Sequence, residues 1–96
     1  HPHLYSRTRD LFDDFARTLA LADSVYILPV FAAREPHDPA VSNEALAEAI
    51  NQKRGSAVAV KGMEETVEIL RSLAHETVAF TMGAGDVYKA GEEALK

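Results

Sequence analysis

Cysteine and tryptophan are both absent from this 96-residue chain. Without cysteine there is no disulfide framework, no thiolate ligand for zinc and no cysteine nucleophile, and this lack of disulfides fits a cytoplasmic location. Long apolar runs are missing too, because no stretch approaches the ~20 residues that a helix needs to cross a bilayer. No signal peptide opens the sequence. We therefore expect a cytoplasmic domain with no membrane partner.

The chain has few positively charged residues. Ten Lys and Arg residues stand against fifteen Asp and Glu residues, which gives a net charge of −5. A protein that binds nucleic acid neutralises phosphates and needs the opposite balance, so we expect no nucleic-acid partner. Hydrophobic residues make up 47% of the chain and charged residues 26%, an ordinary globular balance, and the length suits a single domain over residues 1–96.

Several motifs of catalytic and metal sites are missing as well. The sequence has no GxSxG and no HExxH, and its four histidines lack the paired spacing of a zinc site. It also lacks the GxxxxGK[ST] loop that cradles nucleotide phosphates. If the protein uses ATP, the main phosphate-binding loop must therefore lie outside this chain.

The hydrophobic pattern predicts that the chain opens with a helix followed by a buried strand. Apolar residues at helical spacing predict a helix over residues 8–21, with Thr8 as its N-cap. Residues 24–30 are apolar on both faces, as in a buried parallel strand. Pro29 indicates that this strand ends early or lies at a sheet edge, because proline cannot donate to a ladder.

Further strand and helix patterns alternate to the end of the chain. Ser42 caps a helix that reaches about Lys53, and residues 57–60 predict a second strand with a helix after it. Residues 77–82 predict a third strand, and a last helix follows. This alternation predicts an α/β fold in which three parallel strands are flanked by four helices. Three strands make a small sheet, so we expect an upstream first strand that this stretch lacks.

Glycines follow the third predicted strand, at Gly83-Ala84-Gly85-Asp86. Ligands of parallel sheets bind outside the carboxyl ends of the strands, so this loop is a candidate nucleotide and active-site loop. As a dinucleotide motif it is incomplete, because Tyr88 replaces the third glycine. The alternative is a tight turn in which Asp86 caps the last helix.

A polar run containing His3, Tyr5, Ser6 and Arg7 precedes the first predicted helix. An arginine fork matches a carboxylate with two hydrogen bonds, and histidine and helix N-terminal amides add further donors. These residues are therefore candidates for binding an anionic substrate. The alternative is a frayed, solvated terminus.

Three segments carry a resemblance to a known family. PHLYSRTRDLFDDF at residues 2–15, PVFAAREPHDPAVS at 29–42 and FTMGAGDV at 80–87 resemble the C-terminal domain of the Mur ligases, over nearly the whole chain. The resemblance implies a Rossmann-like fold without its first strand. Leu4 stands where many members of the family have Arg, which removes one plausible contact to a carboxylate or phosphate.

The resemblance also implies a function. The motifs PHxYSRT and TMGAGD are most similar to the member of the family that joins L-alanine to the lactyl carboxylate of UDP-N-acetylmuramate, through an acyl phosphate and at the expense of ATP with Mg²⁺. It implies substrate binding by His3, Tyr5 and Arg7, partner domains upstream that hold the UDP-sugar and the ATP, and no catalytic residue or metal ligand in this chain. Two alternatives stay open: a ligase that recycles muropeptides, and a non-catalytic α/β binding module.

Overall fold

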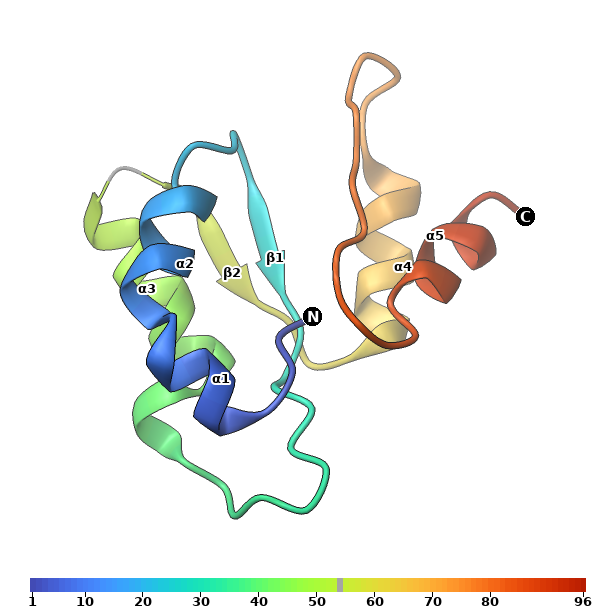
Figure 1. Cartoon of the computed structure of the whole chain (residues 1–96). Coiled ribbons are helices and arrows are strands. Elements are labelled where there is room, and N and C mark those ends of the chain that lie inside the picture. The colour runs from blue at the N-terminus through green and yellow to red at the C-terminus, as the bar shows by residue number, and fades with distance from the viewer. Residues whose placement is uncertain (54) are drawn as a thin grey trace.

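The computed structural model describes residues 1–53 and 55–96, and Arg54 lies outside the described residues. Within those residues the chain forms five α-helices, one 3₁₀ helix and two strands (Figure 1). In chain order they are α1 (Tyr5–Asp10), α2 (Phe12–Leu19), β1 (Val25–Ile27), η1 (Pro39–Val41), α3 (Asn43–Lys53), β2 (Ala57–Ala59), α4 (Met63–Ser72) and α5 (Tyr88–Ala94).

The two strands form a small parallel sheet. Val25 pairs with Ala57 and Ile27 with Ala59, and α3 is the crossover helix that connects the strands. The predicted parallel arrangement of these two strands is confirmed. β1 ends at Ile27, two residues before Pro29, so the strand does end early, as the proline indicated.

The prediction of a third strand is wrong for the described structure. Residues 77–82 run outside any helix or strand, and they pair with no strand in the described part of the chain. Val78, Phe80 and Met82 are 78%, 80% and 67% exposed. A β-pattern in the sequence forms a strand only where a neighbouring strand supplies hydrogen-bond partners, and within residues 1–53 and 55–96 no strand lies beside this segment. A small parallel sheet flanked by helices is therefore what the structure shows.

The first predicted helix differs in its start and its continuity. It begins at Tyr5 and is divided at Leu11, where φ is −111° and ψ is 12°, into α1 and α2. Thr8 is not an N-cap: it lies buried inside α1, and its hydroxyl donates to the Leu4 carbonyl one turn earlier at 2.9 Å. The predicted cap of α3 is confirmed, because Ser42 Oγ accepts from the Ala45 amide at 3.1 Å.

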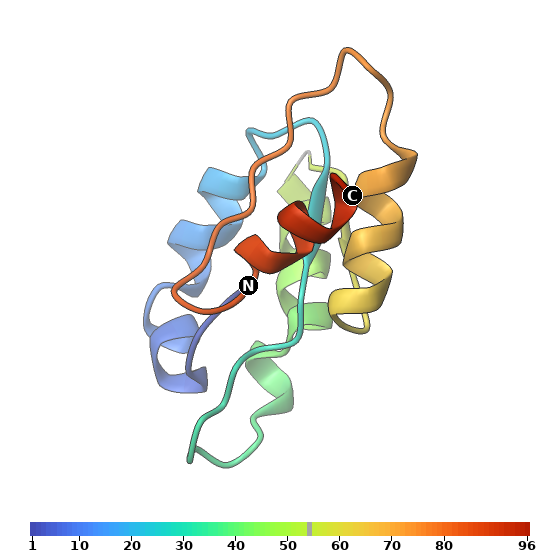
Figure 2. The ribbon, with the colours of Figure 1, turned by 90° about the vertical axis from the view of Figure 1, so that its right-hand side faces the viewer.

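Two hydrophobic clusters hold the elements together. The larger one lies between α2, α3 and the sheet, and includes Ala16, Ile27, Leu46 and Ile50. The smaller one joins Leu28, Val60 and Val87, with Met63 and Ile69 of α4 packed against it. In Figure 1, α2 and α3 lie on one side of the strands and α4 and α5 on the other, and Figure 2 shows the same arrangement from the side of α4 and α5. No helix of the described residues is long and apolar enough to cross a membrane.

Candidate functional site

The candidate segments from the two ends of the chain lie against each other. The nitrogen of His1 donates to the Met82 carbonyl at 2.9 Å. A Cβ atom on Gly83 would lie 3.0 Å from the His1 carbonyl oxygen, and a Cβ atom on Gly85 would lie 2.8 Å from Nε2 of His3. Neither glycine has a positive φ, so close approach of the two segments accounts for glycine here. The structure thus brings His3 to the glycine loop.

The imidazole of His3 has an unused hydrogen-bonding atom beside this loop. Its Nε2 atom and the Nδ1 atom of His1 are buried, and neither has a hydrogen-bond partner among the described residues. On its other side the His3 ring packs against Phe31, with the ring centroids 4.7 Å apart. A buried polar atom without a partner costs ~1–3 kcal/mol, so a group that supplies the partner stabilises the structure.

The loop itself presents backbone and one carboxylate to solvent. Gly83, Ala84 and Asp86 are exposed, and Gly85 is half-buried under His3. The alternative in which Asp86 caps the last helix is wrong, because α5 has Val87 at its N-cap and no side-chain cap bond. The Asp86 carboxylate instead lies 3.7 Å from the Lys89 ammonium, in an exposed pair one helical turn along.

Tyr5 and Ser6 attach α1 to the loop that follows β1. The Tyr5 hydroxyl and Nδ1 of His37 are 2.8 Å apart and share a hydrogen bond. The amide and the hydroxyl of Ser6 donate to the two carboxylate oxygens of Glu35, at 3.0 Å and 2.5 Å. The alternative of a frayed, solvated terminus is therefore wrong: Tyr5, Ser6 and Arg7 lie in α1 and Tyr5 is buried, while His3 lies just ahead of the helix.

A third contact joins α1 to the same loop through an ion pair. The Arg9 guanidinium donates to Asp38 at 2.6 Å, and this hydrogen bond is the main reason why the pKa of Asp38 is lowered. The pKa of Glu35 is lowered too, first by the Ser6 hydroxyl and then by the Ser6 amide. Both carboxylates are thus held in their charged form. We call the Tyr5, Ser6 and Arg9 contacts together the α1–loop contacts.

Arg7 lies within α1 rather than ahead of it, so the expectation that it directly precedes a helix is wrong. Its side chain is exposed and makes no hydrogen bond or ion pair with the described residues. The amide of Ser6, in the first turn of α1, is bonded to Glu35 and is not available to a ligand. No hydrogen bond or ion pair of the described residues joins Arg7 to His3 or to the glycine loop, so the structure assembles only part of the candidate site.

A depression at the carboxyl ends of β1 and β2 contains residues that sequence reasoning missed. It is lined by Tyr5, which was already a candidate, and by His37, Asn43 and Lys61, which were not. Asn43 is buried, and its side-chain amide donates to the carbonyls of Ile27 at 2.9 Å and Val60 at 3.0 Å. The signal that was available is positional: polar residues just after parallel strands lie where ligands of such sheets bind.

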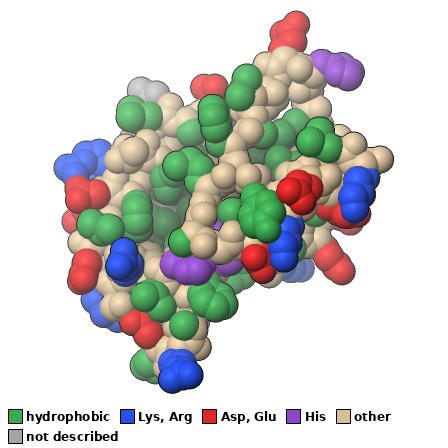
Figure 3. Space-filling model, turned by 45° about the vertical axis from the view of Figure 1, so that its right-hand side comes forward, with side chains coloured by type: hydrophobic (Ala, Val, Ile, Leu, Met, Phe, Trp, Pro, Cys, Tyr) green, Lys and Arg blue, Asp and Glu red, His purple; other side chains and the backbone are tan. Residues whose placement is uncertain are grey.

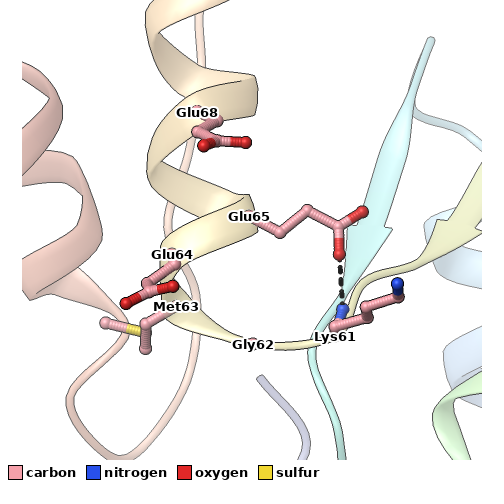
Figure 4. Close-up of a pocket in the computed structure, with 6 residues that line it drawn as sticks. All are labelled: Lys61, Gly62, Met63, Glu64, Glu65 and Glu68. Carbon is pink, nitrogen blue, oxygen red and sulfur yellow. Dashed lines mark hydrogen bonds between the residues drawn. The ribbon is translucent and has the colours of Figure 1, made fainter.

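A second depression surrounds the start of α4 and has a structural explanation. Figure 4 shows Glu65 reaching toward the chain before the helix, and its carboxylate accepts from the Lys61 amide at 2.8 Å. The bond is similar to the carboxylate half of a capping box, although the donor lies one residue before the N-cap Gly62. Glu64 and Glu68 are exposed at its rim.

The described residues offer no set of ligands for a metal ion. No group of three or more His, Asp or Glu side chains lies close enough together to hold one within residues 1–53 and 55–96. These residues therefore do not fit a bound Mg²⁺ by themselves, and no step through it is assigned to this chain.

Comparison with known proteins gives a consistent result. No family model matches the chain. The chain is 38% identical to a UDP-N-acetylmuramate–L-alanine ligase of Lachnospira eligens over 99% of its own length and 21% of the relative's. It is 40% identical to proteins of that name from Desulfosudis oleivorans, over 98% of this chain and 21% of the relative, and from Solibacter usitatus, over 99% and 21%.

The chain spans about a fifth of the length of these curated relatives, and the matched stretch is their C-terminal region. The similarity therefore concerns one part of a larger protein. Over almost its entire length, the chain is related to the C-terminal region of UDP-N-acetylmuramate–L-alanine ligases, which confirms the resemblance to the Mur ligase family.

Proposed function

We propose that this chain is the amino-acid-presenting domain of an ATP-dependent ligase of peptidoglycan synthesis, which joins L-alanine to the lactyl carboxylate of UDP-N-acetylmuramate. The names of its relatives support the reaction. The observation that carries the site is the contact of His3 with Gly85, because it joins two candidate segments that are 82 residues apart. The domain comprises residues 1–96, and the UDP-sugar-binding and ATP-binding domains precede it in the full-length protein.

In this proposal the chain binds and orients substrates and makes no covalent bond itself. L-Alanine has almost no side chain to grip, so its carboxylate is the group to hold. In the closed enzyme the exposed Arg7 fork binds that carboxylate, and His3 and Tyr5, from the same stretch of chain, are the other substrate-binding residues. Gly83, Ala84, Gly85 and Asp86 meet nucleotide or acyl phosphate when the domains close.

The chemical steps follow from the substrates. ATP transfers its γ-phosphoryl group to the lactyl carboxylate, and ADP leaves. The L-alanine amine then attacks the acyl carbon, a C–N bond forms, the C–O bond to phosphate breaks, and the nitrogen loses a proton. Mg²⁺ bound with ATP in the central domain would neutralise phosphate charge there. Because this chain lacks a phosphate loop, we expect it to be inactive alone.

The test is a ligation assay on the full-length protein with UDP-N-acetylmuramate, L-alanine and ATP. Formation of UDP-N-acetylmuramoyl-L-alanine together with ADP and phosphate is expected, and the 96-residue chain alone should give none. A protein that accepts a preformed peptide but not L-alanine would be a recycling ligase. The absence of ligation with every acceptor would favour a binding module.

A further inference from the structure

The start of α1 has no capping side chain of its own. Leu4 stands at the N-cap position, and no side-chain hydrogen bond caps the helix there. The backbone of Leu4 has a φ of 61° and a ψ of 131°, and a positive φ is costly for any residue other than glycine. Such a conformation persists only where the surrounding structure holds it. Contacts from elsewhere in the fold must therefore hold the chain at this point.

Ahead of Leu4, the backbone is held by Phe31. The Phe31 amide donates to the Pro2 carbonyl at 2.9 Å, and the Leu4 amide donates to the Phe31 carbonyl at 2.7 Å. His3, which lies between these two bonds, forms a parallel bridge with Phe31. Phe31 therefore fixes the backbone on the His3 side of the strained residue.

On the helix side of Leu4, the carboxylate of Glu35 takes the place of the missing cap. The amide and the hydroxyl of Ser6 donate to its two oxygens, at 3.0 Å and 2.5 Å. The Ser6 hydroxyl, the Ser6 amide and, less strongly, the Tyr5 amide all lower the pKa of Glu35. A negative charge at the first amides of a helix stabilises that end of it. Glu35 therefore holds the first turn of α1 from outside the helix.

A tight turn connects the two points of attachment. The Glu35 amide donates to the Ala32 carbonyl at 2.9 Å, and Ala33 has a φ of 53°. This i to i+3 bond closes the chain directly after Phe31. Figure 1 shows the chain between β1 and α3 passing beside and below α1. We call residues 31–35 the clamp turn, because one short segment holds the chain both before and after Leu4.

The clamp turn separates the two candidate groups for the substrate carboxylate. Its first residue holds His3, and its last residue holds Ser6, the residue directly before Arg7. Within residues 1–53 and 55–96, no hydrogen bond or ion pair links the Arg7 side chain to His3. Figure 3 shows histidine side chains on one face of the molecule, with Lys and Arg side chains exposed at several places around them. The relative position of His3 and Arg7 thus depends on the clamp turn.

We propose that Glu35 is a positioning residue for substrate binding: through Ser6 it fixes the direction of Arg7, relative to His3, toward the L-alanine carboxylate. The inference rests on the proposed function. Glu35 touches no substrate itself, because both of its oxygens are bonded to Ser6. A guanidinium fork forms two parallel hydrogen bonds only in one plane, so a small rotation of the first turn of α1 weakens both.

The test is steady-state ligation by the full-length protein. Glu35→Ala should raise the KM for L-alanine by about 5- to 50-fold and leave the KM for ATP unchanged, because a misplaced fork loses part of its attraction. Glu35→Gln should restore most of this loss, since its carbonyl oxygen accepts from the Ser6 amide and its NH2 group donates to the Ser6 oxygen. Glu48→Gln, on the exposed side of α3, is the matched control and should change neither constant.

A double-mutant cycle shows whether Glu35 acts through Arg7. In the Arg7→Ala background, Glu35→Ala should change the KM for L-alanine by less than about twofold. Ser6→Ala, which removes only the hydroxyl bond, should give a smaller rise in the same KM, and it replaces Glu35→Ala if that variant fails to fold.

The outcomes separate this inference from the proposed function. If the unsubstituted protein ligates L-alanine and neither Glu35→Ala nor Ser6→Ala raises the KM for L-alanine, the inference is overturned and the proposed function stands. An equal rise in the KM for ATP, or an equal effect of Glu35→Ala without Arg7, shows a purely structural role and overturns the inference as well. If the unsubstituted protein does not ligate L-alanine, the proposed function and the inference both fail.

Discussion

Replacing Asn43 should weaken the fold at the point where the two strands end. Its side-chain amide donates to the carbonyls of Ile27 and Val60, and the residue is 5% exposed. The Ile27 carbonyl also accepts from the Val60 amide at 2.9 Å, so Asn43→Ala leaves it with a partner. The Val60 carbonyl keeps no other donor among the described residues.

The magnitude follows from these two bonds. A typical hydrogen bond contributes ~0.5–1.5 kcal/mol, and a buried carbonyl without a donor costs ~1–3 kcal/mol. Because one carbonyl is fully orphaned and the other is not, Asn43→Ala should lower the free energy of unfolding by about 2–3 kcal/mol. Asn43→Asp should cost more, since it places a carboxylate against two carbonyl oxygens.

The assay is urea unfolding of the chain followed by far-ultraviolet circular dichroism. Gln52→Ala is the control, because Gln52 is exposed on the same helix and should change the stability by less than about 0.5 kcal/mol. A loss for Asn43→Ala no greater than that of the control would refute the reasoning. So would Asn43→Asp proving as stable as Asn43→Ala.

Three further predictions concern the proposed site. In the full-length protein, Arg7→Ala should raise the KM for L-alanine by roughly 10- to 150-fold, while the KM for ATP changes little. Arg7→Lys should restore only part of the loss, because an ammonium group cannot form the two parallel hydrogen bonds. An equal rise in KM for all substrates would indicate lost domain closure instead. Gly85→Val should lower kcat strongly while the fold is retained. Gly62→Ala is the control and should leave kcat unchanged, because a Cβ atom at Gly62 would meet nothing within 4 Å. Full activity of Gly85→Val would mean that the loop is a structural turn with no role in the active site. Because folding lowers the pKa values of Glu35 and Asp38, the Ser6–Glu35 and Arg9–Asp38 contacts stabilise the protein fully above the ordinary values of 4.5 and 3.8. This stabilisation is lost as the pH falls through the lower folded values. An acid titration of the α1 amide signals in NMR should show this loss, and signals that stay constant down to pH 2 would contradict it.

The local pattern was enough to predict the paired strands and the start of α3. The apolar runs at residues 24–30 and 57–60 do form the parallel pair, and Pro29 does shorten the first strand. Ser42 caps α3 because its hydroxyl oxygen accepts a hydrogen bond from the Ala45 amide, which has no partner within the helix. This capping depends on the local sequence alone.

The failures have non-local causes. Residues 77–82 carry a strand pattern, but pairing depends on a neighbour that no local pattern reveals. Thr8 suits an N-cap by type, yet the Ser6–Glu35 bonds hold an extra turn of helix ahead of it. His37 and Asn43 line the depression at the strand ends because of the path that the chain takes after β1. Spacing in the sequence does not predict that path.

The α1–loop contacts change what it costs a ligand to engage Arg7. The residues on either side of it, Ser6 and Arg9, are both bonded to the loop, while the Arg7 side chain itself is exposed. Fixing the backbone of a disordered terminus would cost ~1–2 kcal/mol per residue at the moment of binding. In the proposed function, the folded helix has already lost that backbone entropy, so binding of the L-alanine carboxylate would order only the rotamers of the Arg7 side chain, at ~1.5–2 kcal/mol. A larger part of the free energy of the guanidinium–carboxylate hydrogen bonds would therefore contribute to the affinity.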